Sequence, residues 1–111
     1  MSERNWTLYI ADMRRFAETV REYTDGLDQT DFIADRRTYD AVLRNLELIG
    51  EAATHIPGAI RDRHPDIPWR MIVATRNRLI HGYLGLDDDI IWSLVIDELP
   101  GLIVKLGRIE R

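Results

Sequence analysis

The chain has 111 residues and a mass of 13.0 kDa, which is the length of one domain. It contains no cysteine, so disulfides, thiolate metal sites and cysteine nucleophiles are excluded. The net charge of −4 provides no global positive field that would attract a phosphate polymer. All the basic residues except Lys105 are arginines, and arginine binds phosphate or carboxylate through a planar fork of donors. A genome rich in G and C produces the same bias, so the arginine excess by itself identifies no ligand.

Apolar residues recur every three or four positions, which predicts helices along the whole chain. We expect a helix over residues 6–23, a second that begins near Asp31 or Asp35 and ends before Pro57-Gly58, and a short helical turn over 59–64. A third helix runs from about Trp69 to His81. Aspartates at 87–89 open a fourth helix, which Pro100 should kink or divide. The predicted fold is an all-α bundle of four or five helices, with residues 1–111 as a single domain.

The sequence contains no segment that approaches the ~18 uninterrupted apolar residues of a membrane span. Its N-terminus opens into a charged amphipathic stretch, which is unlike a secretory signal. We therefore expect a cytoplasmic protein with no membrane association.

Arg76 interrupts the apolar face of the third predicted helix. At about 100° per residue, this face carries Trp69, Ile72, Val73, Arg76, Ile80 and Tyr83. A guanidinium cannot lose its proton to escape burial, so it needs a partner or a polar cleft. Two interpretations stay open. Arg76 pairs with a carboxylate of the second helix, such as Glu47 or Glu51, or the face lines a groove or another subunit.

Polar and basic residues surround Arg76 in the sequence. Asn77 and His81 are four residues apart and therefore share one side of the helix, with Arg70 on that side and Arg78 at its edge. Residues 61–81 carry five arginines against two aspartates, a local charge of +3 within an acidic chain. His81 is the side chain best suited to proton transfer near neutral pH, although a histidine at a helix end is often only a cap or a surface residue. The combination favours acid–base chemistry beside an anion site.

The remaining motifs carry little chemistry. His55 and His64 lie near prolines and have no such neighbours, and three scattered histidines make a weak metal site. Asp87, Asp88 and Asp89 are explained by the start of a helix. We predict no metal and no cofactor.

The segment Arg76–Tyr83 has the pattern arginine, four residues, histidine, one residue, tyrosine. This pattern resembles the signature of HEPN-domain ribonucleases, specifically the HepT-like toxins of toxin–antitoxin pairs. Further segments match the family: Leu48-Ile49-Gly50-Glu51-Ala52, Ile67-Pro68-Trp69, and Trp92 with Leu99-Pro100. The resemblance therefore covers nearly the whole chain.

The resemblance implies an antiparallel helical bundle that forms a homodimer, in which the two motif helices line a shared cleft. It implies metal-independent RNA cleavage, in which the 2′-hydroxyl attacks the adjacent phosphate. His81 would act as general acid or base, and Arg76 would stabilise the charge that grows on the phosphate. Asn77 would orient His81 or the substrate, and Arg70 and Arg78 are candidate contacts to RNA phosphates.

The resemblance also implies a partner, a minimal nucleotidyltransferase antitoxin of the MntA type, in a type VII-like HepT/MntA system. In the family, this enzyme can transfer AMP to the motif tyrosine, here Tyr83, and the added phosphate would obstruct RNA binding. Two alternatives remain open. The chain could be a non-catalytic HEPN-like module that docks the nucleotidyltransferase and binds nucleotide or RNA, or only the modification target of a toxic partner.

Overall fold

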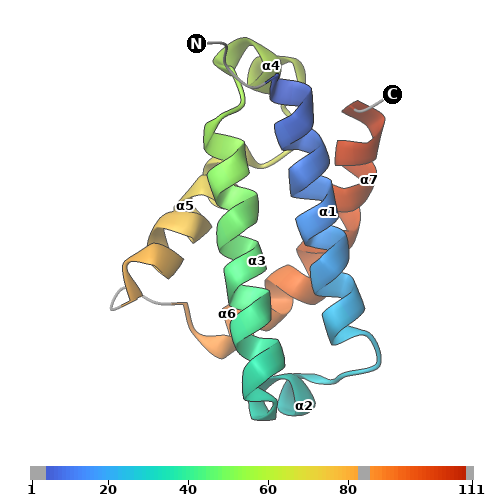
Figure 1. Cartoon of the computed structure of the whole chain (residues 1–111), viewed down its shortest axis with the longest axis vertical. Coiled ribbons are helices and arrows are strands. Elements are labelled where there is room, and N and C mark those ends of the chain that lie inside the picture. The colour runs from blue at the N-terminus through green and yellow to red at the C-terminus, as the bar shows by residue number, and fades with distance from the viewer. Residues whose placement is uncertain (1–4, 83–85, 110–111) are drawn as a thin grey trace.

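The computed structural model describes residues 5–82 and 86–109, and the regular structure within these ranges is entirely helical (Figure 1). The elements are α1 (Trp6–Thr24), α2 (Gln29–Ala34), α3 (Arg36–Thr54), α4 (Gly58–Arg63), α5 (Trp69–Ile80), α6 (Asp88–Ser93), the π-helix η2 (Leu94–Glu98) and α7 (Leu99–Ile109). The predicted all-α fold is confirmed. The short helix α2 was not predicted.

Four of the helices begin at a side chain that accepts a backbone N–H, as capping residues do. Asn5 caps α1, Asp28 caps α2, Asp35 caps α3 and Asp87 caps α6. The side-chain hydrogen bond from Thr38 is the main reason that the pKa of Asp35 is lowered. The predicted starts near Asp35 and at the aspartate run are therefore confirmed.

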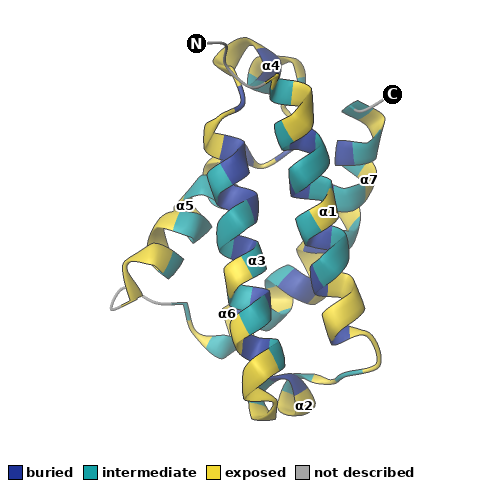
Figure 2. Ribbon diagram, in the orientation of Figure 1, coloured by how far each residue is buried: buried dark blue, intermediate teal, exposed yellow. Residues whose placement is uncertain are grey.

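The core lies where α1 packs against α3 and against α7 (Figure 1). The predicted apolar stripes supply it, because residues three or four apart on each helix point to the same side. The fully enclosed side chains include Ile10, Met13, Val20, Phe32, Val42 and Leu106. Figure 2 shows the same pattern, with buried residues along the facing sides of α1 and α3.

The predicted interruption at Pro100 takes the form of a π-helix. Proline has no N–H, and in an α-helix its ring would clash with the carbonyl of the residue four positions earlier, here Ile96. In η2 the backbone spacing widens instead, and the N–H of Leu99 donates to the carbonyl of Leu94, five residues back. The chain therefore passes from α6 into α7 without a loop.

Helix α5 stands apart from the rest of the bundle (Figure 1), and its main tertiary packing is against α3. Trp69 and Ile72 in its first half are buried, whereas Ile80 in its last turn is 44% exposed. Gly82 follows with a φ of +40°, in the left-handed region that glycine tolerates after a helix. None of the described helices combines the length and apolar character that crossing a membrane requires.

Candidate active site

The guanidinium of Arg76 is held on two sides. Its Nη2 donates to Oε2 of Glu51 on α3 at 2.7 Å, and its Nη1 donates to Oδ1 of Asn77 at 2.9 Å. The Arg76 side chain is 27% exposed. Of the two interpretations left open, the ion pair with α3 is therefore observed, with Glu51 as the partner. Glu47 pairs with Arg44 at 3.0 Å instead.

The Nε–H of Arg76 is buried and has no hydrogen-bond partner among the described residues. Buried donors are almost always paired, because an unpaired one keeps its full desolvation cost. An arginine placed here only for stability would be expected to pair this donor as well. Two hydrogen bonds therefore hold the Arg76 guanidinium in one orientation, while its Nε–H donor remains unpaired within the described part of the chain.

Gly50 allows α5 to approach α3 closely at Arg76. A Cβ atom at position 50 would lie 2.2 Å from Cβ of Arg76 and 3.0 Å from the backbone oxygen of Ile72. Any larger residue would push α5 away, and Glu51 would no longer reach the guanidinium in this geometry. The glycine at position 50 therefore lets Arg76 come close enough to pair with Glu51, the next residue of α3.

His81 is the C-cap of α5, and its backbone N–H donates to the carbonyl of Asn77 at 3.2 Å. His81 is exposed, one helical turn beyond Asn77, so an imidazole and an anchored guanidinium lie on the same short helix. Tyr83, the predicted modification site, lies outside the described residues.

The basic residues of segment 61–81 have different structural roles. Arg61 donates to the carbonyls of Ala53 at 2.7 Å and Ile56 at 3.1 Å, and so caps the end of α3. Arg70 and Arg78 are exposed. Arg70 and Asn77 border an open hollow of about 670 Å³ between α5 and the α4 region, which Arg61 also lines.

His55 has closer neighbours than its position in the sequence suggested. Its ring stacks on Tyr9 of α1, with ring centroids 4.6 Å apart and an angle of 11° between the planes. Its Nε2 lies 3.7 Å from Oε1 of Glu51, the same carboxylate that holds Arg76. The spacing of Glu51 and His55, four residues apart on one helix, was a signal available in the sequence. The contact with Tyr9 was not, because it joins two helices.

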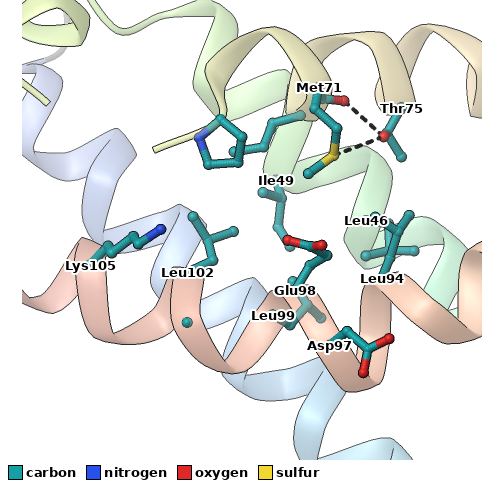
Figure 3. Close-up of a pocket in the computed structure, with 13 residues that line it drawn as sticks. Leu46, Ile49, Met71, Thr75, Leu94, Asp97, Glu98, Leu99, Leu102 and Lys105 are labelled. Carbon is teal, nitrogen blue, oxygen red and sulfur yellow. Dashed lines mark hydrogen bonds between the residues drawn. The ribbon is translucent and has the colours of Figure 1, made fainter. Parts of the chain in front are cut away.

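A separate cleft of about 180 Å³ opens on another side of α5, between α3, η2 and α7 (Figure 3). Core side chains line it, among them Leu46, Ile49 and Ile72, and Asp97, Glu98 and Lys105 stand on the η2 and α7 side. None of the predicted site residues within the described ranges lines this cleft. Among the described residues, no three histidine, aspartate or glutamate side chains gather as a metal site would.

Comparison with known proteins identifies the family. The model of the family described as "Ribonuclease HepT-like" matches residues 13–109. A protein of Thermococcus cleftensis named "Probable ribonuclease HepT" is 37% identical over 93% of this chain and 94% of its own length. A Methanocaldococcus jannaschii protein named "Putative RNase MJ1380" is 37% identical over 90% of this chain and 92% of its own. No solved structure matches the chain.

The match of the family model extends over most of the chain, and both relatives align over nearly their full lengths. The chain therefore belongs to the HepT-like ribonuclease family. The family resemblance stated from the sequence motifs is confirmed.

Proposed function

We propose that this protein is a metal-independent endoribonuclease whose site is formed by Arg76, Asn77 and His81. The observation that carries the proposal is the anchored guanidinium of Arg76, one helical turn and a half before an exposed histidine at the end of α5. Membership in a family of HepT-like ribonucleases supports RNA as the substrate.

The proposed reaction uses groups of the chain and the RNA, with solvent water for the proton transfer that His81 does not perform. The 2′-oxygen attacks the adjacent phosphorus and loses its proton to a base, and the 5′-oxygen of the next nucleotide leaves with a proton from an acid. His81 performs one of these proton transfers, and Arg76 stabilises the additional negative charge on the phosphate oxygens. Asn77 positions Arg76 through the hydrogen bond at 2.9 Å.

The proposed site is completed by a second copy of the chain, with the two α5 helices lining one cleft. The exposed Ile80 in the last turn of α5 supports this arrangement, because the apolar stripe of the helix continues beyond the core of a single chain. Two copies also double the local positive charge, with the exposed Arg70 and Arg78 as proposed phosphate contacts. RNA affinity that falls with increasing salt concentration would agree with such contacts, and salt-independent affinity would contradict them.

The proposed partner is an MntA-like nucleotidyltransferase antitoxin that inhibits the ribonuclease by transferring AMP to Tyr83. The adduct would place a phosphate next to Arg76 and His81, where it would repel RNA. The test is the intact mass of this chain after incubation with the purified partner and ATP. A mass increase of one AMP that Tyr83→Phe abolishes is expected, and an unchanged mass would refute this control mechanism.

The ribonuclease activity is tested by incubating purified protein with single-stranded RNA in EDTA. We expect products with 2′,3′-cyclic phosphate ends, and no cleavage of the same sequence with 2′-O-methyl groups. His81→Ala and Arg76→Ala should each slow cleavage by about 100- to 10,000-fold. His64→Ala and Arg37→Ala are the matched controls and should cleave as the wild type does. Cleavage that survives both site substitutions would contradict the proposal.

A second candidate function is a non-catalytic HEPN-like module that docks the nucleotidyltransferase. The ion pair between Arg76 and Glu51 favours it, because a purely structural arginine would form the same contact. Tight complex formation without RNA cleavage would support this alternative. A third candidate, in which the chain is only the modification target, requires the AMP adduct on Tyr83 and no activity of its own.

A further inference from the structure

The stacked pair of Tyr9 and His55 presents an aromatic surface outside the residues assigned to the proposed reaction. The two rings are almost parallel, with 11° between their planes, and Tyr9 covers one face of the imidazole. The His55 side chain is nevertheless 48% exposed. Because Tyr9 covers one face, the opposite face and the ring edge are the parts of the imidazole through which a ligand can reach it.

This aromatic surface lies next to the anchored arginine. Glu51 connects the two, with Oε2 at 2.7 Å from Nη2 of Arg76 and Oε1 at 3.7 Å from Nε2 of His55. With ordinary carboxylate geometry, the two nitrogens are at most about 9 Å apart. This upper limit is compatible with a phosphate group at Arg76 and the base of a neighbouring nucleotide at His55.

The side chains at His55 offer a base two kinds of contact, an aromatic ring face and a carboxylate oxygen. At 3.7 Å from Nε2, Oε1 is beyond hydrogen-bond distance and remains able to accept from an amino group of a base. Single-stranded RNA is commonly bound by stacking its bases on aromatic side chains, histidine included.

We propose that the exposed face of His55, supported from behind by Tyr9, is a stacking platform for one RNA base next to the phosphate bound at Arg76. The proposal rests on the proposed ribonuclease function and adds a base-binding subsite to it. In this role Tyr9 is a positioning residue, because its ring fixes the plane of the imidazole.

The test measures binding of a short single-stranded RNA of mixed sequence that carries 2′-O-methyl groups and so cannot be cleaved. His55→Ala should weaken binding by about 5- to 100-fold, the contribution of one stacked base. His55→Phe restores the aromatic face and should return binding to near the wild-type value. His64→Ala is the matched control and should bind as the wild type does. Unfolding curves for all variants separate loss of stability from loss of binding.

Two further measurements distinguish a base platform from other roles of His55. The slope of log affinity against log salt concentration should be the same in His55→Ala as in the wild type, because no phosphate contact is lost. Replacing single nucleosides of the probe by abasic ones should reveal one position at which the abasic effect and the His55→Ala effect are not additive. A changed salt slope, or additivity at every position, would overturn the proposal.

The outcomes also separate this proposal from the proposed function. If wild-type protein neither binds the probe nor cleaves RNA, both proposals are wrong. If it binds and cleaves, and His55→Ala binds equally well, only the platform is refuted. If His55→Phe is as weak as His55→Ala while both remain folded, the imidazole acts through its nitrogens, and the stacking proposal is again refuted.

Discussion

Helix α3 packs against α1 on one side and against α5 on the other, and the two interfaces are built from different side chains. The α1 side is apolar and closed, with Ile10, Met13 and Val42 fully buried. The α5 side is built on a glycine at which the two backbones come close together, and on an ion pair that is only partly buried. The first interface stabilises the fold by burying apolar surface. The second holds the charged guanidinium of Arg76 in place.

The comparison shows how one helix can serve both purposes. Successive residues of a helix point about 100° apart, so a single sequence carries two independent faces. Substitutions on the α1 face should therefore change the free energy of unfolding and leave the rate per folded molecule unchanged. Substitutions on the α5 face should change both.

The largest effect on stability is expected for Ile10→Ala in the closed interface. Ile10 has no exposed surface, so truncation leaves a cavity in the core and should cost about 2–5 kcal/mol. The measurement is urea unfolding, with Leu8→Ala as control, since Leu8 lies on the same helix but is 48% exposed. Under conditions where both remain folded, their RNA cleavage rates should equal that of the wild type. A slower rate in folded Ile10→Ala would show that the two faces of α3 are coupled.

A smaller loss of stability, but a loss of activity, is expected for Gly50→Ala. The new Cβ would lie 2.2 Å from Cβ of Arg76, and part of the obstruction is backbone, so α5 must shift at a cost of about 1–3 kcal/mol. The control is Gly101→Ala on α7, where an added Cβ meets no atom within 4 Å. That variant should be unchanged or more stable, because alanine favours helix over glycine. Equal behaviour of the two variants would contradict the close approach at Gly50.

The smallest effect is expected for Tyr39→Phe, which lies far along α3 from the candidate site. The Tyr39 hydroxyl donates to Oδ1 of Asp88 at 2.6 Å, and its loss should cost about 1 kcal/mol. Burial, and then the bond to Asp88, raises the pKa of Tyr39 from 10.0 to about 12. A raised pKa means that this stabilisation is complete below pH 10 and is lost as the pH rises towards 12.

Unfolding measured across this pH range provides the check on Tyr39. The difference in stability between wild type and Tyr39→Phe should be constant below pH 10 and should shrink above it. Tyr23→Phe is the control, because Tyr23 is 46% exposed, and it should show no such difference. A stability difference between wild type and Tyr39→Phe that stays unchanged up to pH 12 would contradict the structural role of the buried hydroxyl.

Features that depend on neighbours within one turn or two were predicted from the sequence. The apolar stripes, the start of α3 at Asp35, the start of α6 at Asp87 and the end of α5 at His81 all follow from side chains close in the chain. The separate helix α2 was not predicted, because its six residues are too few to show a helical period in the sequence. Pro100 predicted an interruption, and the structure shows that it takes the form of the π-helix η2 just before the proline.

The candidate site divides in the same way. The sequence alone placed Arg76, Asn77 and His81 on one helix, because spacing along a helix fixes which side chains are neighbours. It required either a partner or a polar cleft for Arg76. It left Glu47 and Glu51 as equal candidates and gave His55 no role. Only the tertiary structure decided for Glu51 and brought Tyr9 onto His55, because these contacts depend on how closely α5 and α1 approach α3. That approach is set by packing between helices, and at Gly50 by the absence of a single side chain.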